Sequence, residues 1–251
     1  MEGSWKVLGR PLENHRKTTS ETGIIISLPQ NIPKYQFMRK LLLIFTTIIL
    51  LGTILQGCSV SGLYLLSLNE VHRPEDTKIR YGEYKIEKNL VKDSLYYVYE
   101  DELINISWDF FPAGFYFTLE NKSEHSIKLL WDDAAYVNTA GITKRLIHSA
   151  VKFVDKEKPQ VPVVIPDHSI LKEKIYPADN VEYVLLFSGY TLVIWPIIPN
   201  EAESKKALIK MSKEHIGKTI RVVLPLQVQD VVNEYDFYFL IEDIIISRGR
   251  W

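Results

Sequence analysis

The chain has 251 residues, of which 46% are hydrophobic and 24% are charged, and its formal net charge is −1. This apolar fraction is typical of globular proteins and excludes both an unfolded chain and a membrane protein with many spans. Acidic and basic residues are interspersed along the chain. This pattern disfavours nucleic-acid binding, because proteins that bind nucleic acids concentrate basic residues on one face. The single cysteine excludes an internal disulfide framework and a multi-cysteine metal cluster. We therefore predict no cofactor and no nucleic-acid partner.

Residues 1–37 are polar, contain three prolines and show little apolar periodicity. We predict that they are disordered, because a polar segment of this kind cannot build a core. They precede Met38, where the pattern of a secretory signal peptide begins. The simplest interpretation is that translation starts at Met38 and that residues 1–37 are an over-extended reading frame. A cytoplasmic extension that is removed with the signal is the alternative.

Residues 38–57 have the three parts of a secretory signal peptide: the basic pair Arg39-Lys40, an apolar run from Leu41 to Leu55, and the small residue Gly57. The apolar run is 15 residues long, whereas a helix that crosses a bilayer needs about 20. A cleaved signal peptide is therefore favoured over a permanent transmembrane helix. A short uncleaved anchor is the alternative.

The end of this segment, Leu55-Gln56-Gly57-Cys58, resembles the lipobox of bacterial lipoproteins. The resemblance implies that the Cys58 thiol receives a diacylglyceryl group, that cleavage occurs between Gly57 and Cys58, and that acyl chains such as palmitate anchor the protein to a membrane. Two long chains hold a protein on a bilayer where one does not. Without lipidation, Cys58 would be a small apolar residue of a hydrophobic segment.

The residue after the cysteine bears on the location of such a lipoprotein. Ser59 is not one of the acidic residues that retain enteric lipoproteins in the inner membrane. The resemblance therefore implies the outer membrane if the host is Gram-negative, and otherwise the extracytoplasmic face of the plasma membrane.

Residues 58–80 are predicted to be the lipidated cysteine and a linker, in which Leu63–Leu68 suits either a first strand or a membrane contact. Residues 81–251 are predicted to form an all-β domain, a mostly antiparallel immunoglobulin-like β-sandwich. Short runs of β-branched and aromatic residues recur at a spacing of roughly 8–12 residues, separated by turn residues. The best helix signal is Glu201–Glu214. The expected strands are Leu95–Tyr99, Leu103–Trp108, Phe115–Leu119, Ile127–Trp131, Thr143–His148, Val161–Ile165, Ile170–Tyr176, Tyr183–Phe187, Thr191–Trp195, Thr219–Val228 and Glu234–Ser247.

Three segments of this domain, Phe117–Ser123, Ile127–Asp132 and Arg145–Ser149, resemble uncharacterised bacterial lipoproteins with an immunoglobulin-like sandwich. The resemblance covers roughly residues 95–246, and its motifs mark strands and turns. Separately, Phe115–Leu119 and Ile127–Trp131, joined by the polar turn Glu120–Glu124, predict a hairpin-like unit. The resemblance implies a fold and an envelope location, and it transfers no activity.

No motif for catalysis or metal binding stands out in the mature chain. A zinc site needs three or four converging ligands, whereas the histidines are far apart in the sequence, and Gly-x-Ser-x-Gly is absent. We therefore predict no catalytic, cofactor-binding or metal-binding residue and expect a non-enzymatic module that binds an envelope protein or polymer. The alternative is an envelope hydrolase that pairs a histidine with Asp132 or Asp133. The histidines are His72, His125, His148, His168 and His215.

The 17 residues Tyr183–Pro199 contain no charge. We predict two buried strands joined by a turn at Ser188-Gly189-Tyr190. The alternative concerns the last five residues, which would form an exposed apolar loop that touches a membrane or a partner. Two of them are prolines, which lack the N–H group that a central strand needs. This possible contact loop consists of Trp195, Pro196, Ile197, Ile198 and Pro199.

Overall fold

The computed structural model describes residues 34–54, 59–74, 82–91, 94–187 and 189–247, and the chain divides into two compact units, residues 1–56 and 57–251. The first unit contains helix α1 (Lys34–Ile54), on which the described apolar side chains of residues 41–45 and of Ile48 are exposed. In the described part of the chain, no helix combines the length and the apolarity that crossing a bilayer requires. Residues 1–33, Gly57 and Cys58 lie outside the described residues, so disorder, cleavage and lipidation stay predictions.

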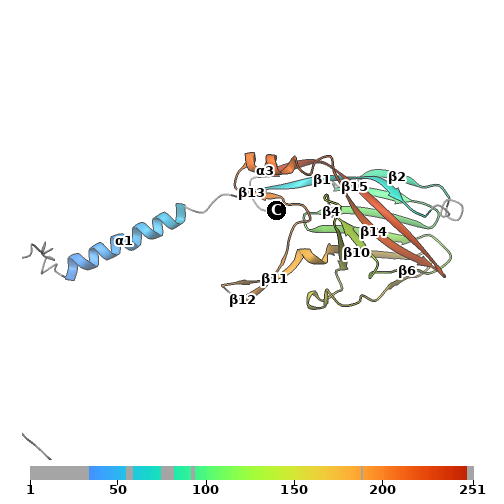
Figure 1. The fold of residues 1–251 in the computed structure, drawn as a ribbon, viewed down its shortest axis with the longest axis horizontal. Coiled ribbons are helices and arrows are strands. Elements are labelled where there is room, and N and C mark those ends of the chain that lie inside the picture. Colours follow the sequence, from blue (N-terminus) through green and yellow to red (C-terminus); the bar gives the residue numbers. More distant parts are fainter. Residues whose placement is uncertain (1–33, 55–58, 75–81, 92–93, 188, 248–251) are drawn as a thin grey trace, which may run out of the picture. The chain divides into compact units, whose positions relative to one another are not determined.

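The second unit is built on one large curled sheet and a separate two-stranded sheet (Figure 1). The large sheet has the strand order β13-β1-β15-β14-β7-β8-β10-β5-β4-β3-β2, and β6 pairs with both β14 and β9. The strand pairs of the described residues run antiparallel, which confirms the prediction of an all-β, mostly antiparallel fold. The strands are β1 (Val60–His72), β2 (Lys85–Val91), β3 (Ser94–Glu100), β4 (Ile104–Phe111), β5 (Gly114–Asn121), β6 (Ile127–Leu129), β7 (Ala135–Val137), β8 (Thr143–His148), β9 (Val163–Ile165), β10 (Ile170–Pro177), β11 (Val181–Leu186), β12 (Gly189–Ile194), β13 (Glu201–Ala202), β14 (Thr219–Val228) and β15 (Val231–Ser247).

Aromatic side chains fill the space where the two halves of the curled sheet face each other. The ring of Trp108 on β4 lies 5.0 Å from that of Phe237 and 5.3 Å from that of Phe239, both on β15. Tyr99 on β3 contacts the rings of Tyr235 and Phe237 edge-on. Because alternate residues of a strand point to the same face, Tyr235, Phe237, Phe239 and Ile241 of β15 all enter this core. The core therefore joins β3, β4 and β5 to the long strand β15.

Strand β1 lies inside the segment that the sequence predicted to be a linker. It pairs with β15 along its length, from Ser61 opposite Ser247 to His72 opposite Asp236, and Leu66 and Val71 are buried in the core. The β-domain therefore begins near residue 60 and not at residue 81. A membrane-proximal run and a core strand have the same apolar composition, and only the pairing with the distant β15 separates them.

The hairpin predicted from Phe115–Leu119 and Ile127–Trp131 is wrong. Strand β5 pairs with β4 and β10, whereas β6 pairs with β14 and β9. Asn121 directs this crossing: its buried amide nitrogen lies within hydrogen-bond distance of the carbonyl groups of Ile165 and Pro166, and its oxygen accepts from Ser123. The polar turn therefore leads the chain from one half of the sheet to the other.

The predicted helix Glu201–Glu214 is present in a shorter form. Helix α3 (Lys205–Ser212) begins after Ser204, whose hydroxyl oxygen accepts the N–H of Ala207 as an N-cap. The residues before the cap form strand β13 and pair with β1. The helix is amphipathic and buries Leu208.

Candidate functional site

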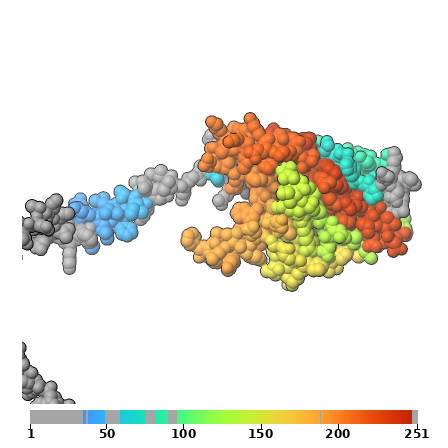
Figure 2. All heavy atoms as spheres, in the orientation of Figure 1, coloured from blue at the N-terminus to red at the C-terminus, as the bar shows by residue number. Residues whose placement is uncertain are grey.

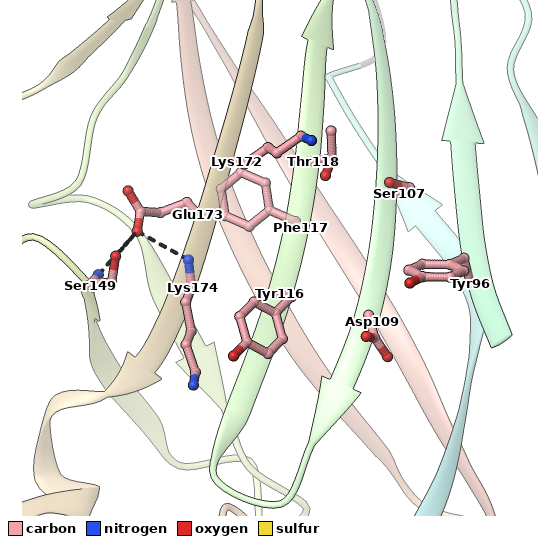
Figure 3. Close-up of a pocket in the computed structure, with 10 residues that line it drawn as sticks. All are labelled: Tyr96, Ser107, Asp109, Tyr116, Phe117, Thr118, Ser149, Lys172, Glu173 and Lys174. Carbon is pink, nitrogen blue, oxygen red and sulfur yellow. Dashed lines mark hydrogen bonds between the residues drawn. The ribbon is translucent and has the colours of Figure 1, made fainter. Parts of the chain in front are cut away.

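A hollow of 570 Å³ crosses the outward face of β10, β5, β4 and β3 (Figure 3). It combines aromatic, hydroxyl, cationic and acidic side chains, whose backbone positions are fixed by these four strands and by the loop after β8. The side chains on the opposite face of β5 and β4, such as Phe115 and Trp108, lie in the core. The hollow is lined by Tyr96, Ser107, Asp109, Tyr116, Phe117, Thr118, Ser149, Lys172, Glu173 and Lys174.

The strand register arranges most of these side chains in two rows that cross the strands. Residues two apart on a strand share a face and lie about 6.5–7 Å apart. Each row takes one residue from each neighbouring strand, so it places a cationic group, an aromatic or hydroxyl group and another polar group side by side (Figure 3). The first row is Lys174, Tyr116 and Asp109 with Tyr96 beyond, and the second row is Lys172, Thr118 and Ser107.

Lys174 carries a positive charge among aromatic rings at one end of the first row. Its Nζ lies 4.3 Å from the ring centre of Phe111, 4.6 Å from that of Tyr116 and 5.5 Å from that of Tyr176. Cations over aromatic faces are attracted by the ring quadrupole. Partial burial lowers the pKa of Lys174, but hydrogen bonding with the two tyrosine hydroxyls outweighs it and raises the pKa above the ordinary value. The ammonium group therefore stays charged beside the hollow.

Glu173 is a nearly buried carboxylate at the edge of the hollow, with its side chain 10% exposed. It accepts the N–H groups of Ser149 at 3.1 Å and of Lys174 at 3.0 Å, and it also accepts the Ser149 hydroxyl. Nδ1 of His148 lies 3.4 Å from the carboxylate, and the His148 ring stacks on Trp131. Burial raises the pKa of Glu173, but these donors outweigh burial and lower the pKa to about 2.

The change Glu173→Gln is expected to destabilise the domain at neutral pH, on the order of 2–3 kcal/mol. A carboxylate whose pKa is lowered by folding stabilises the fold above its ordinary pKa of 4.5 and loses this contribution as the pH falls toward 2. Urea unfolding of both chains should therefore show a difference at pH 7 that shrinks as the pH falls below about 4.5. The control is Glu120→Gln, an exposed acid on β5. A difference that does not change with pH would contradict this assignment.

The hydrolase alternative paired a histidine with Asp132 or Asp133, and the structure gives these two acids other surroundings. Asp132 accepts hydrogen bonds from Arg145 and from the N–H of Gln160, and Asp133 is exposed. His148 instead faces Glu173, to which Ser149 also donates. A serine nucleophile needs a base, such as an imidazole, that takes its proton, whereas the Ser149 hydroxyl here donates to an ionised carboxylate.

The other histidines contact different partners: His125 lies 3.1 Å from the Gln229 amide, and His215 lies 3.2 Å from the Thr139 hydroxyl. His72 lies 2.6 Å from Glu70 and His168 lies 3.3 Å from Glu124, in both cases between exposed side chains. Among the described residues, no group of three or more His, Cys, Asp or Glu side chains is arranged to hold a metal ion.

The possible contact loop Trp195–Pro199 closes one end of the fold. Ile198 is 4% exposed and belongs to the main core, and Ile197 packs against it. Pro199 is exposed, but its carbonyl accepts the Tyr64 hydroxyl. Trp195 is 48% exposed. Burial of Ile198 therefore contradicts exposure at that residue, Ile197 is partly buried, and Trp195 and Pro199 are exposed; contact of the loop with a membrane or a partner stays a hypothesis.

The uncharged strands before this loop are paired as predicted but are not buried as predicted. Strands β11 and β12 form a hairpin that pairs Val181 with Ile194 and Leu186 with Gly189. Its far end, here called the hairpin tip, is exposed and consists of Leu185, Leu186, Phe187 and Tyr190. A two-stranded ribbon has no second layer to cover its faces, so its apolar side chains remain open to solvent.

The hollow was not among the sites predicted from the sequence. A usable signal was the alternation of polar and apolar residues in Ser107–Asp109 and in Tyr116–Thr118. The register that joins these strands to Lys172–Lys174 comes only from the fold. Comparisons with protein-family models, with curated proteins and with solved structures found no match to this chain.

Proposed function

We propose that this chain is a lipid-anchored protein of the bacterial cell envelope whose β-domain binds an extended polar polymer in the hollow of Figure 3 without transforming it. The observation that carries the proposal is the pair of side-chain rows across β10, β5, β4 and β3. Aromatic faces, hydroxyls and ammonium groups on a rigid open surface suit a hydrated polymer that offers hydroxyl and acidic groups along its length. Binding residues on a rigid scaffold are a common use of β-domains.

The lipid anchor is supported by the sequence before the domain. Leu55-Gln56-Gly57-Cys58 provides the site of lipidation, and strand β1 begins at Val60, directly after it. An anchor at Cys58 would thus hold the β-domain close to the membrane surface. This position suits a protein that meets polymers of the envelope.

Binding without catalysis is supported by the chemistry at the edge of the hollow. Glu173 has a pKa of about 2 and is ionised at neutral pH, so it is a poor general acid. The Ser149 hydroxyl is oriented toward this carboxylate. Both groups therefore serve to hold β10 beside the loop after β8.

The change Tyr116→Ala is expected to weaken binding to purified cell-wall polymer at least about fivefold, which corresponds to ~1 kcal/mol. Tyr116 lies in the middle of the first row, is 43% exposed and forms one side of the Lys174 site. Co-sedimentation of the chain with insoluble wall polymer, with soluble wall fragments as competitors, measures the effect.

The matched control is Tyr183→Ala, which removes an equally exposed tyrosine from the hairpin and not from the hollow. This variant should bind as the parent does, and both variants should keep the melting temperature of the parent. Equal binding by Tyr116→Ala and the parent, or no binding of the parent to the polymer, overturns the polymer-binding proposal.

A further inference from the structure

The hairpin tip exposes large apolar side chains that are next to one another in the hairpin. Leu185 is 65% exposed, Tyr190 is 75% exposed and Phe187 is fully exposed. No charge lies between Tyr183 and Pro199. Contiguous exposed apolar side chains of this kind mark a surface that something covers.

The base of the hairpin is fixed to the domain, so the tip projects at a defined place. Val181 is buried in a second apolar cluster with Ile147 and Tyr176, and Ile194 packs against that cluster. The N–H of Trp195 donates to the carbonyl of Asn180 at 2.7 Å. Figure 2 shows the hairpin as an arm that leaves the body of the domain. At about 3.3 Å per residue the paired arm is roughly 20 Å long.

The point where the chain enters the domain lies beside this base. Ser61, near the start of β1, lines one hollow of 530 Å³ together with Ile194 and Trp195. Cys58 precedes Ser61 by three residues, which span at most about 11 Å of extended chain. Acyl chains on Cys58 would therefore enter the bilayer within a short distance of the hairpin base.

We propose that the β11–β12 hairpin is a second membrane contact, and that its tip rests in the interfacial layer of the bilayer that holds Cys58. The inference rests on the lipid attachment in the proposed function. Tyrosine is enriched where a bilayer meets water, and Tyr190 lies at the tip of this hairpin. Two contacts, the lipid and the tip, would restrict how the β-domain is oriented on the membrane more than the lipid alone would.

The depth of the contact follows from the backbone. Each strand of a two-stranded sheet has one edge with unpaired N–H and C=O groups, and hydrocarbon does not tolerate such edges. The tip should therefore lie at the boundary of headgroups and acyl chains, about 5–10 Å deep, as amphipathic interfacial segments do. Since the arm contains no basic residue, the contact requires no anionic lipid.

The test uses the full chain with Phe187→Cys, labelled with an environment-sensitive fluorescent maleimide and reconstituted in phosphatidylcholine vesicles. We expect the emission to shift to the blue and to be quenched more strongly by lipids spin-labelled near the headgroup than by lipids labelled near the chain end. The matched control is Val164→Cys, an exposed residue of β9 that pairs with Lys128 of β6. Figure 1 shows β6 away from the β11–β12 hairpin. Its label should show neither effect.

Failure of the inference can be distinguished from failure of the anchor. Because Cys58 is the only cysteine, the unsubstituted chain takes up maleimide only if Cys58 is free. If the parent chain does not react with maleimide and floats with the vesicles, the lipid anchor is supported. If the label at position 187 is then not quenched by the lipids, the hairpin contact is overturned and the anchor is not. A reactive parent that does not float overturns both. A blue shift without lipid quenching that disappears on dilution means that a second copy covers the tip, which also overturns the inference.

Discussion

Replacing Asp101 by asparagine is expected to lower the free energy of unfolding by about 3–5 kcal/mol, because it leaves a buried guanidinium without its counter-charge. The Asp101 side chain is completely buried, and its Oδ2 lies 2.8 Å from Nη1 of Arg73, which is also buried. Breaking such a pair by removing one partner costs far more than the loss of an exposed pair.

The other contacts of Asp101 make asparagine a poor substitute despite its equal size. The hydroxyls of Tyr99 and Tyr235 donate to Oδ2, and the N–H groups of Leu103 and Ile104 donate to Oδ1. Burial, with the nearby Asp101 carboxylate, raises the pKa of both tyrosines well above the ordinary value, so both remain donors. An amide nitrogen would therefore meet donors in either orientation. Asp101 joins the end of β1, the turn between β3 and β4, and β15.

Urea unfolding of Asp101→Asn and of the control Asp133→Asn measures this effect. Asp133 is exposed, so its replacement should change the free energy of unfolding by less than about 0.5 kcal/mol. Unfolding midpoints of Asp101→Asn and the parent that coincide would show that the buried ion pair contributes little to stability.

Most strands were predictable because each is set by its own residues, whereas β2, β7 and β13 were not among the expected strands. Strands β8 and β14 have the predicted bounds, Thr143–His148 and Thr219–Val228, since runs of β-branched and apolar residues favour strand wherever they lie. The turn that joins β11 and β12 was predictable for the same reason: Gly189 has a φ of +115°, which glycine adopts without strain.

The hollow and the Asp101 contacts were not predictable because they depend on register and on distant strands. Lys172, Thr118 and Ser107 share a row only because β5 lies between β10 and β4. Arg73 and Tyr235 reach the same carboxylate from opposite ends of the domain sequence. The order of residues along one strand does not indicate which distant strand will lie beside it, so neither contact can be read from the sequence. Burial within the uncharged segment Tyr183–Pro199 was not predictable for the same reason. Its buried part around Ile198 and its exposed hairpin tip are both composed of uncharged, mostly apolar residues.

Within that segment, Ile198→Ala is expected to lower the free energy of unfolding by about 2–5 kcal/mol, as truncation of a buried isoleucine does. The backbone around Ile198 cannot move inward to fill the space. The N–H of Ile197 donates to the carbonyl of Pro112 at 2.8 Å, and the carbonyl of Pro199 accepts the Tyr64 hydroxyl at 3.1 Å. The surroundings therefore cannot collapse, and a residual cavity adds to the cost of the lost apolar contact.

The matched variant Leu185→Ala removes a side chain of the same size from the exposed hairpin tip. It should change the free energy of unfolding by less than about 1 kcal/mol, because its side chain is already largely in water. Thermal or urea unfolding of the two variants compares them directly. Similar losses from both would mean that the tip is packed in the folded protein, and then the hairpin would have no apolar surface left for a membrane. If Ile198→Ala lowers the free energy of unfolding strongly and Leu185→Ala does not, then the uncharged segment has a core part at Ile198 and an exposed part at the hairpin tip.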